Sequence, residues 1–106
     1  MPKFLLKSTY TVAGMRGLAS DGGTRRAEVV QAMVENAGGR LESMHFAFGE
    51  DDTYVLCEMP DHPTAASVAI AIEAAGGLRV QVVPVLTPAE VDEATHRTIT
   101  YSPPGA

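Results

Sequence analysis

Apolar and polar residues alternate in four segments of the chain, which is the period of a β-strand whose two faces meet different surroundings. The segments are residues 3–11, 41–48, 53–59 and 78–86. In the first of them the two sides consist of Phe4, Leu6, Ser8 and Tyr10, and of Leu5, Lys7, Thr9 and Thr11. The alternation predicts four strands with one apolar face and one more polar face.

Two longer helices are predicted from apolar residues that recur every three or four positions. The first covers residues 24–37, with Thr24 as its N-cap and a left-handed stop at Gly38-Gly39. The second covers residues 64–75, with Thr64 as its cap. This second helix is apolar nearly all round, so we expect it to be covered on more than one side.

Two short helices and a tail complete the pattern. Residues 12–19 suit a short helix that Asp21-Gly22-Gly23 interrupts. Thr87-Pro88-Ala89-Glu90 combines an N-cap, a proline at the first helical position and a glutamate that can bond back to the cap, which predicts a helix. We expect one domain over residues 1–95, followed by an extended, Pro-rich tail over residues 96–106.

The order of these elements predicts an α+β fold, the ferredoxin-like β-α-β-β-α-β sandwich, with two helices on one face of a four-stranded antiparallel sheet. Its uncovered face would be too apolar for open water and too polar for a dry core. We expect a second copy to cover this face, giving a homodimer or higher oligomer with an internal cleft; a monomer with a solvated sheet is the alternative. The residues of this face would be Leu5, Lys7, Thr9, Arg79, Gln81, Val83 and Val85.

Charge and composition exclude several classes of partner. The formal net charge is −5 and the 8 basic residues are scattered, which disfavours nucleic acid and anionic membrane surfaces. Cys57 is the only cysteine, so the chain has no intrachain disulfide and no thiolate zinc cluster. No segment reaches the ~18 apolar residues that span a bilayer, and no motif indicates a cofactor or a metal. We expect a cytoplasmic protein.

The candidate ligand-binding residues are polar groups on the predicted strands, namely Lys7, Thr9, Tyr10, His45 and Arg79. Lys7 and Arg79 would hold a small anionic or polar ligand, and salt bridges across a dimer interface explain the same two residues. His45 alternates with Leu41, Ser43 and Ala47, which would point it into a dimer cleft; a hydrogen-bonded strand histidine is the simpler interpretation. We expect Glu58 on the opposite face of the sheet.

Charged residues outside the strands have simpler explanations. The hairpin turn carries Glu50, Asp51 and Asp52, which could hold a hard cation but suit a solvated loop better. We expect Asp52 to cap this turn through its side chain. Arg25 and Arg26 begin a helix, the unfavourable end for a cation, and we interpret them as a solvated pair.

Four stretches of the chain together resemble the GYD domain family. They are Lys3–Thr11, Phe46–Val55, Met59–Asp61 and Leu86–Ala94. In the hairpin turn that gives the family its name, Gly49 and Asp52 match, whereas Asp51 stands where tyrosine is common. The resemblance implies a small cytosolic protein of the ferredoxin-like or dimeric α/β-barrel group, and it implies no particular activity.

Three functions remain open at this point. The first is a homo-oligomeric small-molecule-binding or assembly protein that uses the open sheet face. The alternative is a cofactor-independent enzyme, monooxygenase- or isomerase-like, acting on a small organic substrate in the dimer cleft with His45 or Tyr10 as the proton-transfer group. The third is an accessory protein that binds another chain through its Pro-rich tail.

Overall fold

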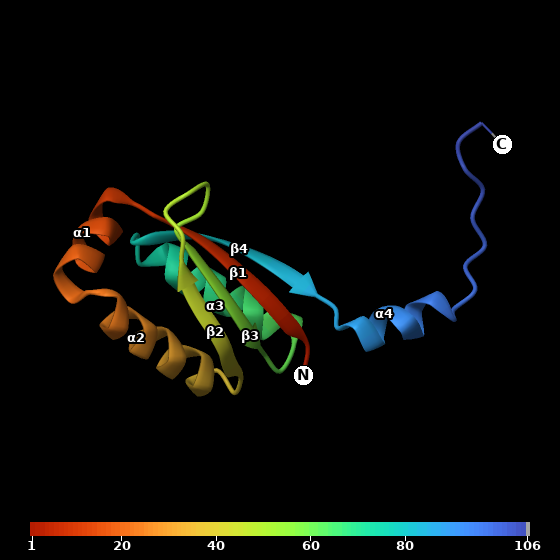
Figure 1. The fold of residues 1–106 in the computed structure, drawn as a ribbon, viewed down its shortest axis with the longest axis horizontal. Coiled ribbons are helices and arrows are strands. Elements are labelled where there is room, and N and C mark those ends of the chain that lie inside the picture. Colours follow the sequence, from red (N-terminus) through yellow and green to blue (C-terminus); the bar gives the residue numbers. More distant parts are fainter. Residues whose placement is uncertain (106) are drawn as a thin grey trace.

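The computed structural model describes residues 1–105 of the chain, which form four strands and four helices (Figure 1). In chain order these are β1 (Lys3–Tyr10), α1 (Val12–Asp21), α2 (Gly23–Asn36), β2 (Arg40–Phe46), β3 (Thr53–Glu58), α3 (His62–Ala74), β4 (Leu78–Val85) and α4 (Pro88–Thr95). None of the helices within residues 1–105 combines the length and the apolarity that crossing a bilayer requires.

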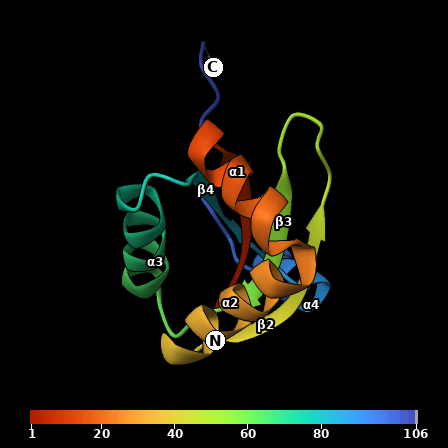
Figure 2. The same cartoon turned by 90° about the vertical axis from the view of Figure 1, so that its left-hand side faces the viewer.

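The four strands form one sheet in the order β2-β3-β1-β4, and every neighbouring pair is antiparallel. Helices α1, α2 and α3 lie on one face of this sheet, with α3 apart from the other two (Figure 2). This arrangement confirms the predicted α+β, ferredoxin-like fold. The opposite face carries no element of the described chain and is called the open sheet face below; its residues include Lys3, Leu5, Lys7, Thr9, Tyr54, Leu56, Glu58, Arg79, Gln81, Val83 and Val85.

The core lies between the sheet and the helices, as the alternation of β1 predicts. Phe4 and Leu6 of β1 are buried beside Val55 and Cys57 of β3, and α2 contributes the fully buried Val34. Further along the same side, Ser8 and Thr53 are buried as well, and their hydroxyl groups form a hydrogen bond of 2.8 Å. This bond satisfies both groups away from water.

Two predicted helix caps are wrong, and a third is confirmed. Helix α2 begins at Gly23 because Gly22, with φ of 82°, turns the chain directly out of α1, so Thr24 lies inside the helix. Helix α3 is capped by Asp61, whose carboxylate accepts a hydrogen bond of 2.8 Å from the backbone N–H of Thr64. The box formed by Thr87 and Glu90 at the start of α4 is present in full.

Two predicted assignments of strand residues to a face of the sheet are also wrong, those of Leu41 and Glu58. A β-bulge between Leu41 and Ser43 interrupts the alternation of β2, so Leu41 faces the core and does not share a face with His45, which points to the open side as predicted. Glu58 stands opposite Lys3, which puts it on the open sheet face with the other charged strand residues. In both cases the register between strands decides the direction, and one strand alone does not reveal it.

Helix α3 is less covered than its composition predicts. Only Ala65 and Val68 are buried, and Ile70 is 69% exposed. Within one copy, coverage on more than one side is therefore a wrong prediction. The cause is that α3 packs on the edge strand β4 and reaches no second layer.

Helix α4 and the residues after it extend away from the sheet and its helices (Figure 1). Every residue from Pro88 to Gly105 is exposed. The molecule is consequently elongated, with extents of 56 × 33 × 22 Å.

Candidate ligand-binding site

A cavity of about 410 Å³ lies between the helices and the sheet, and it is called the helix–sheet cavity below. It exists because α2 packs against β2 at one edge of the sheet whereas α3 packs against β4 at the other. The space over the two central strands is therefore left partly unfilled. Its volume falls within the ~300–1,000 Å³ of small-molecule sites.

Close backbone packing fixes the end of the cavity where α1 lies. A methyl group at Gly14 would overlap the carbonyl oxygen of Gly77, so only glycine allows this approach. The Thr11 hydroxyl donates to the Gly76 carbonyl at 2.8 Å, and the Thr11 N–H donates to the Gly77 carbonyl at 3.0 Å. These bonds tie the start of α1 to the loop before β4, which holds Leu18 of α1 at the cavity wall.

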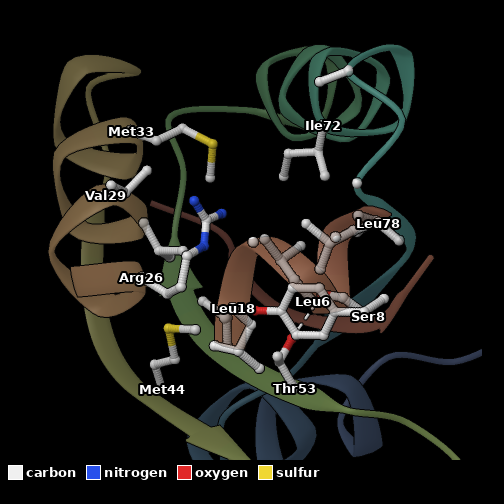
Figure 3. Close-up of a pocket in the computed structure, with 18 of the residues that line it drawn as sticks. Leu6, Ser8, Leu18, Arg26, Val29, Met33, Met44, Thr53, Ile72 and Leu78 are labelled. Atoms are coloured by element: carbon white, nitrogen blue, oxygen red, sulfur yellow. Dashed lines mark hydrogen bonds between the residues drawn. The ribbon is translucent and has the colours of Figure 1, made fainter. Parts of the chain in front are cut away.

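Most of the cavity wall is apolar (Figure 3). The sheet supplies its floor, and the three helices supply its sides. Met33 from α2 and Met44 from β2 are among the lining residues. Methionine adapts its shape more readily than branched residues, so these two side chains form a deformable part of the wall. The other apolar side chains of the lining include Leu6, Leu18, Val29, Val30, Val55, Ile72, Leu78 and Val80.

The polar groups of the floor can donate hydrogen bonds. Thr53 and Ser8 share one hydrogen bond, so whichever hydroxyl donates, the hydrogen of the other remains available (Figure 3). Tyr10 of β1 also lines the cavity, and within residues 1–105 its hydroxyl forms no hydrogen bond. A ligand group that accepts hydrogen bonds suits this part of the cavity.

Arg26 supplies the cation of the cavity. Its side chain is half-buried, and Figure 3 shows its guanidinium pointing inward from α2. No carboxylate within residues 1–105 lies at ion-pair distance from Arg26, although Asp21 belongs to the same lining. Its neighbour Arg25 instead points to solvent and pairs with Glu28 at 3.7 Å.

The interpretation of both arginines as a solvated pair is therefore right for Arg25 and wrong for Arg26. The inward position of Arg26 could be predicted from the sequence, because Arg26 stands four and seven positions before Val30 and Met33. These positions share one side of a helix, so Arg26 belongs to the stripe that faces the sheet.

The five candidate residues of the sequence divide between the two faces of the sheet. Lys7, Thr9 and Arg79 line a smaller hollow of about 250 Å³ that reaches the open sheet face. Tyr10 lies in the helix–sheet cavity. His45 is exposed on the edge strand β2, three strand spacings from β4, so it lies at least roughly 14 Å from Arg79 at ~4.8 Å per strand.

The hairpin turn contacts β1 through two aspartate side chains. Asp51 is buried and its carboxylate pairs with Lys7 at 3.4 Å. Asp52 was expected to cap the turn, but its carboxylate accepts a hydrogen bond of 2.9 Å from the backbone N–H of Tyr10 and so caps the end of β1. Among the residues that the structure describes, no cluster of three acidic, histidine or cysteine side chains is placed to hold a metal ion.

Cys57 faces the core from β3 and is fully buried. Burial raises the pKa of its thiol to about 11, because the charged thiolate loses its hydration. The thiol is therefore neutral near pH 7 and unsuited to nucleophilic chemistry.

The fold and the site define a class, a ferredoxin-like α+β domain with an open sheet face and an apolar cavity under its helices. A family model for the GYD domain matches residues 4–95, and the chain belongs to the GYD domain family. A comparison with curated proteins finds no match for the chain.

Proposed function

We propose that the chain is a homo-oligomeric protein that binds a small, mainly apolar molecule with one carboxylate, and that the ligand lies in the helix–sheet cavity. The observation that carries this proposal is Arg26, a half-buried cation in a mainly apolar cavity that forms no ion pair within residues 1–105. A buried cation is costly when it lacks a partner. A ligand carboxylate would supply that partner.

The hydroxyl groups of the lining support the same ligand class, and Asp21, the carboxylate of the lining, is exposed to solvent. Tyr10 and the Ser8–Thr53 pair offer hydroxyl hydrogens, and Arg26 offers only N–H donors. A carboxylate accepts hydrogen bonds without donating any, so it matches all of these groups at once. The apolar wall would bury the body of the ligand at about 25 cal/mol per Å² of apolar surface.

Binding fits this site better than proton-transfer catalysis. The enzyme alternative relied on His45 or Tyr10 in a dimer cleft, and His45 lies on the open sheet face, where that cleft would form, and not at the helix–sheet cavity. Tyr10 alone remains beside the cavity. Homo-oligomerisation is supported by the open sheet face, where apolar side chains stand among charged ones without any covering element within residues 1–105.

The test compares a carboxylate with a neutral molecule of the same shape. Cinnamate and cinnamamide are titrated into the protein by calorimetry or by ligand-observed NMR. We expect cinnamate to bind more tightly by roughly 10- to 100-fold, because a hydrogen bond to a charged group contributes about 1.5–3 kcal/mol. Arg26→Met should remove this preference and retain the binding of cinnamamide.

Matched variants separate the cavity from the surface. Arg25→Met removes the neighbouring exposed cation and should leave both affinities unchanged. Val30→Trp, which fills the cavity, should weaken both compounds together. The proposal fails if neither compound binds to the wild type, or if Arg25→Met and Arg26→Met have equal effects.

A further inference from the structure

The open sheet face carries a band of apolar side chains within a charged frame. Leu5, Leu56 and Val85 are half-buried, and Val83 is 37% exposed. Lys7 and Arg79 stand beside this band on β1 and β4. Lys7 pairs with Asp51 at 3.4 Å, and within residues 1–105 Arg79 forms no ion pair. Asp51 and Glu73 line the same hollow as Lys7 and Arg79, so Arg79 is the unpaired cation beside the band among the described residues, and the band is suited to an apolar occupant that carries a carboxylate.

Both edges of the sheet are protected against pairing with another strand. The edge strand β4 contains Pro84, which has no N–H to donate. The edge strand β2 contains the bulge at Glu42. Such features discourage edge-to-edge association. An occupant is therefore expected on the face of the sheet.

The C-terminal arm, defined as residues 86–105, has the matching properties. Its apolar side chains are uncovered, with exposed fractions of 66% for Leu86, 47% for Val91, 80% for Ile99 and 73% for Tyr101. Between Pro88 and Thr95, helix α4 carries three acidic residues and no basic one, and Arg97 pairs with one of the three. The arm is thus both apolar and acidic.

The arm also lacks support from its own copy. An isolated helix as short as α4 is marginal in water even when it is well capped, so packing on another surface would stabilise it. Figure 1 shows the arm leading away from the sheet that it leaves. The open sheet face that it can reach therefore belongs to another copy.

We propose that the arm of one copy lies across the open sheet face of a second copy, and that the reciprocal contact closes a two-fold dimer. This inference rests on the homo-oligomeric part of the proposed function and names its interface. The apolar side of the arm covers the band around Leu56, and one of its carboxylates faces Arg79. The arm and the face together provide the roughly 20–30 residues per partner of a standard interface.

The test uses one variant in each half of the interface, with full-length protein in sedimentation equilibrium. Leu56→Glu disables the face, and Val91→Glu disables the arm. Each variant alone should raise the dimer dissociation constant by roughly 30-fold or more, the effect of losing an interface hot spot. Ile70→Glu is the control, because Ile70 is an aliphatic residue on α3 that is more exposed than Val91 or Leu56, and its change should leave the dimer intact.

Mixing the two defective variants gives the decisive measurement. A heterodimer of Leu56→Glu and Val91→Glu retains one intact arm on one intact face, so an equimolar mixture should form dimers at concentrations where each variant alone is monomeric. If Val91→Glu alone dimerises like the wild type, the arm is not part of the interface, although the protein is still homo-oligomeric.

Two further results would overturn the inference. A wild type that is monomeric at all concentrations refutes both the arm contact and the homo-oligomer, while ligand binding in the cavity is tested separately. A mixture that stays monomeric refutes the exchange. If Leu56→Glu loses its helical circular dichroism, Val83→Glu replaces it as the face variant.

Discussion

Gly14 and Gly17 lie on the same helix, α1, yet the structure predicts opposite effects for the same substitution. In Gly14→Ala the new methyl group would overlap the Gly77 carbonyl, and a backbone atom cannot move aside as a flexible side chain can. In Gly17→Ala the methyl group would meet nothing within 4 Å. The difference in stability between the two variants therefore measures the effect of the close approach of α1 to the loop before β4.

The expected magnitudes follow from three contributions. Glycine to alanine in a helix interior stabilises by about 1 kcal/mol, and this gain applies at both positions. At Gly14 it is opposed by about 1–3 kcal/mol of overpacking and by about 1 kcal/mol for each weakened hydrogen bond from Thr11 to the Gly76 and Gly77 carbonyls. We expect Gly14→Ala to lower the free energy of unfolding by about 2 kcal/mol and Gly17→Ala to raise it by about 1 kcal/mol.

Urea denaturation followed by circular dichroism measures both changes. A shift of the midpoint at constant slope reports stability alone, and thermal melting should show Gly14→Ala lower by roughly 8–16 °C. If Gly14→Ala is as stable as the wild type, the contact between α1 and Gly77 is not as close as described. The end wall of the cavity would then also be wrong.

Two further predictions concern the core. Thr53→Val leaves the buried hydroxyl of Ser8 without its partner and should cost about 1–2 kcal/mol; adding Ser8→Ala should restore part of this loss, and additive losses in urea denaturation would contradict the pairing. Burial raises the pKa of Cys57 to about 11, so its neutral thiol contributes stability that is present below the unfolded pKa near 8.5 and is lost as the pH rises toward 11. Cys57→Ala should flatten that alkaline decline in thermal melts, and fast reaction of the native thiol with Ellman's reagent at pH 8 would contradict its burial.

The elements of this fold could be predicted because each strand shows its period locally. The buried row from Phe4 to Ser8 and the capping box at Thr87 depend on residues that are neighbours in the chain. The bulge at Glu42 and the position of Glu58 could not be found this way, since they depend on the pairing between strands. The sequence alone does not distinguish Asp61 from Thr64 as the cap, because both residue types cap helices and they stand three positions apart.

The candidate site was harder to predict than the fold. A cavity depends on the distance between α2 and α3, which no local pattern encodes. The sequence feature that indicates the cavity is Arg26, because a charged residue on an apolar helical stripe is costly to bury without a partner. The alternation of the strands indicates polar residues on both faces of the sheet, and of the five candidates only Tyr10 lies at this cavity.

The methionines of the cavity wall have a consequence for selectivity. Met33 and Met44 have unbranched side chains with three rotatable bonds, so the wall can reshape itself around bodies of different outline. The guanidinium of Arg26 has fixed geometry and permanent charge. On the proposed function, such a cavity tolerates a range of hydrocarbon skeletons and discriminates sharply at a single functional group, so we expect a series of related acids among its ligands.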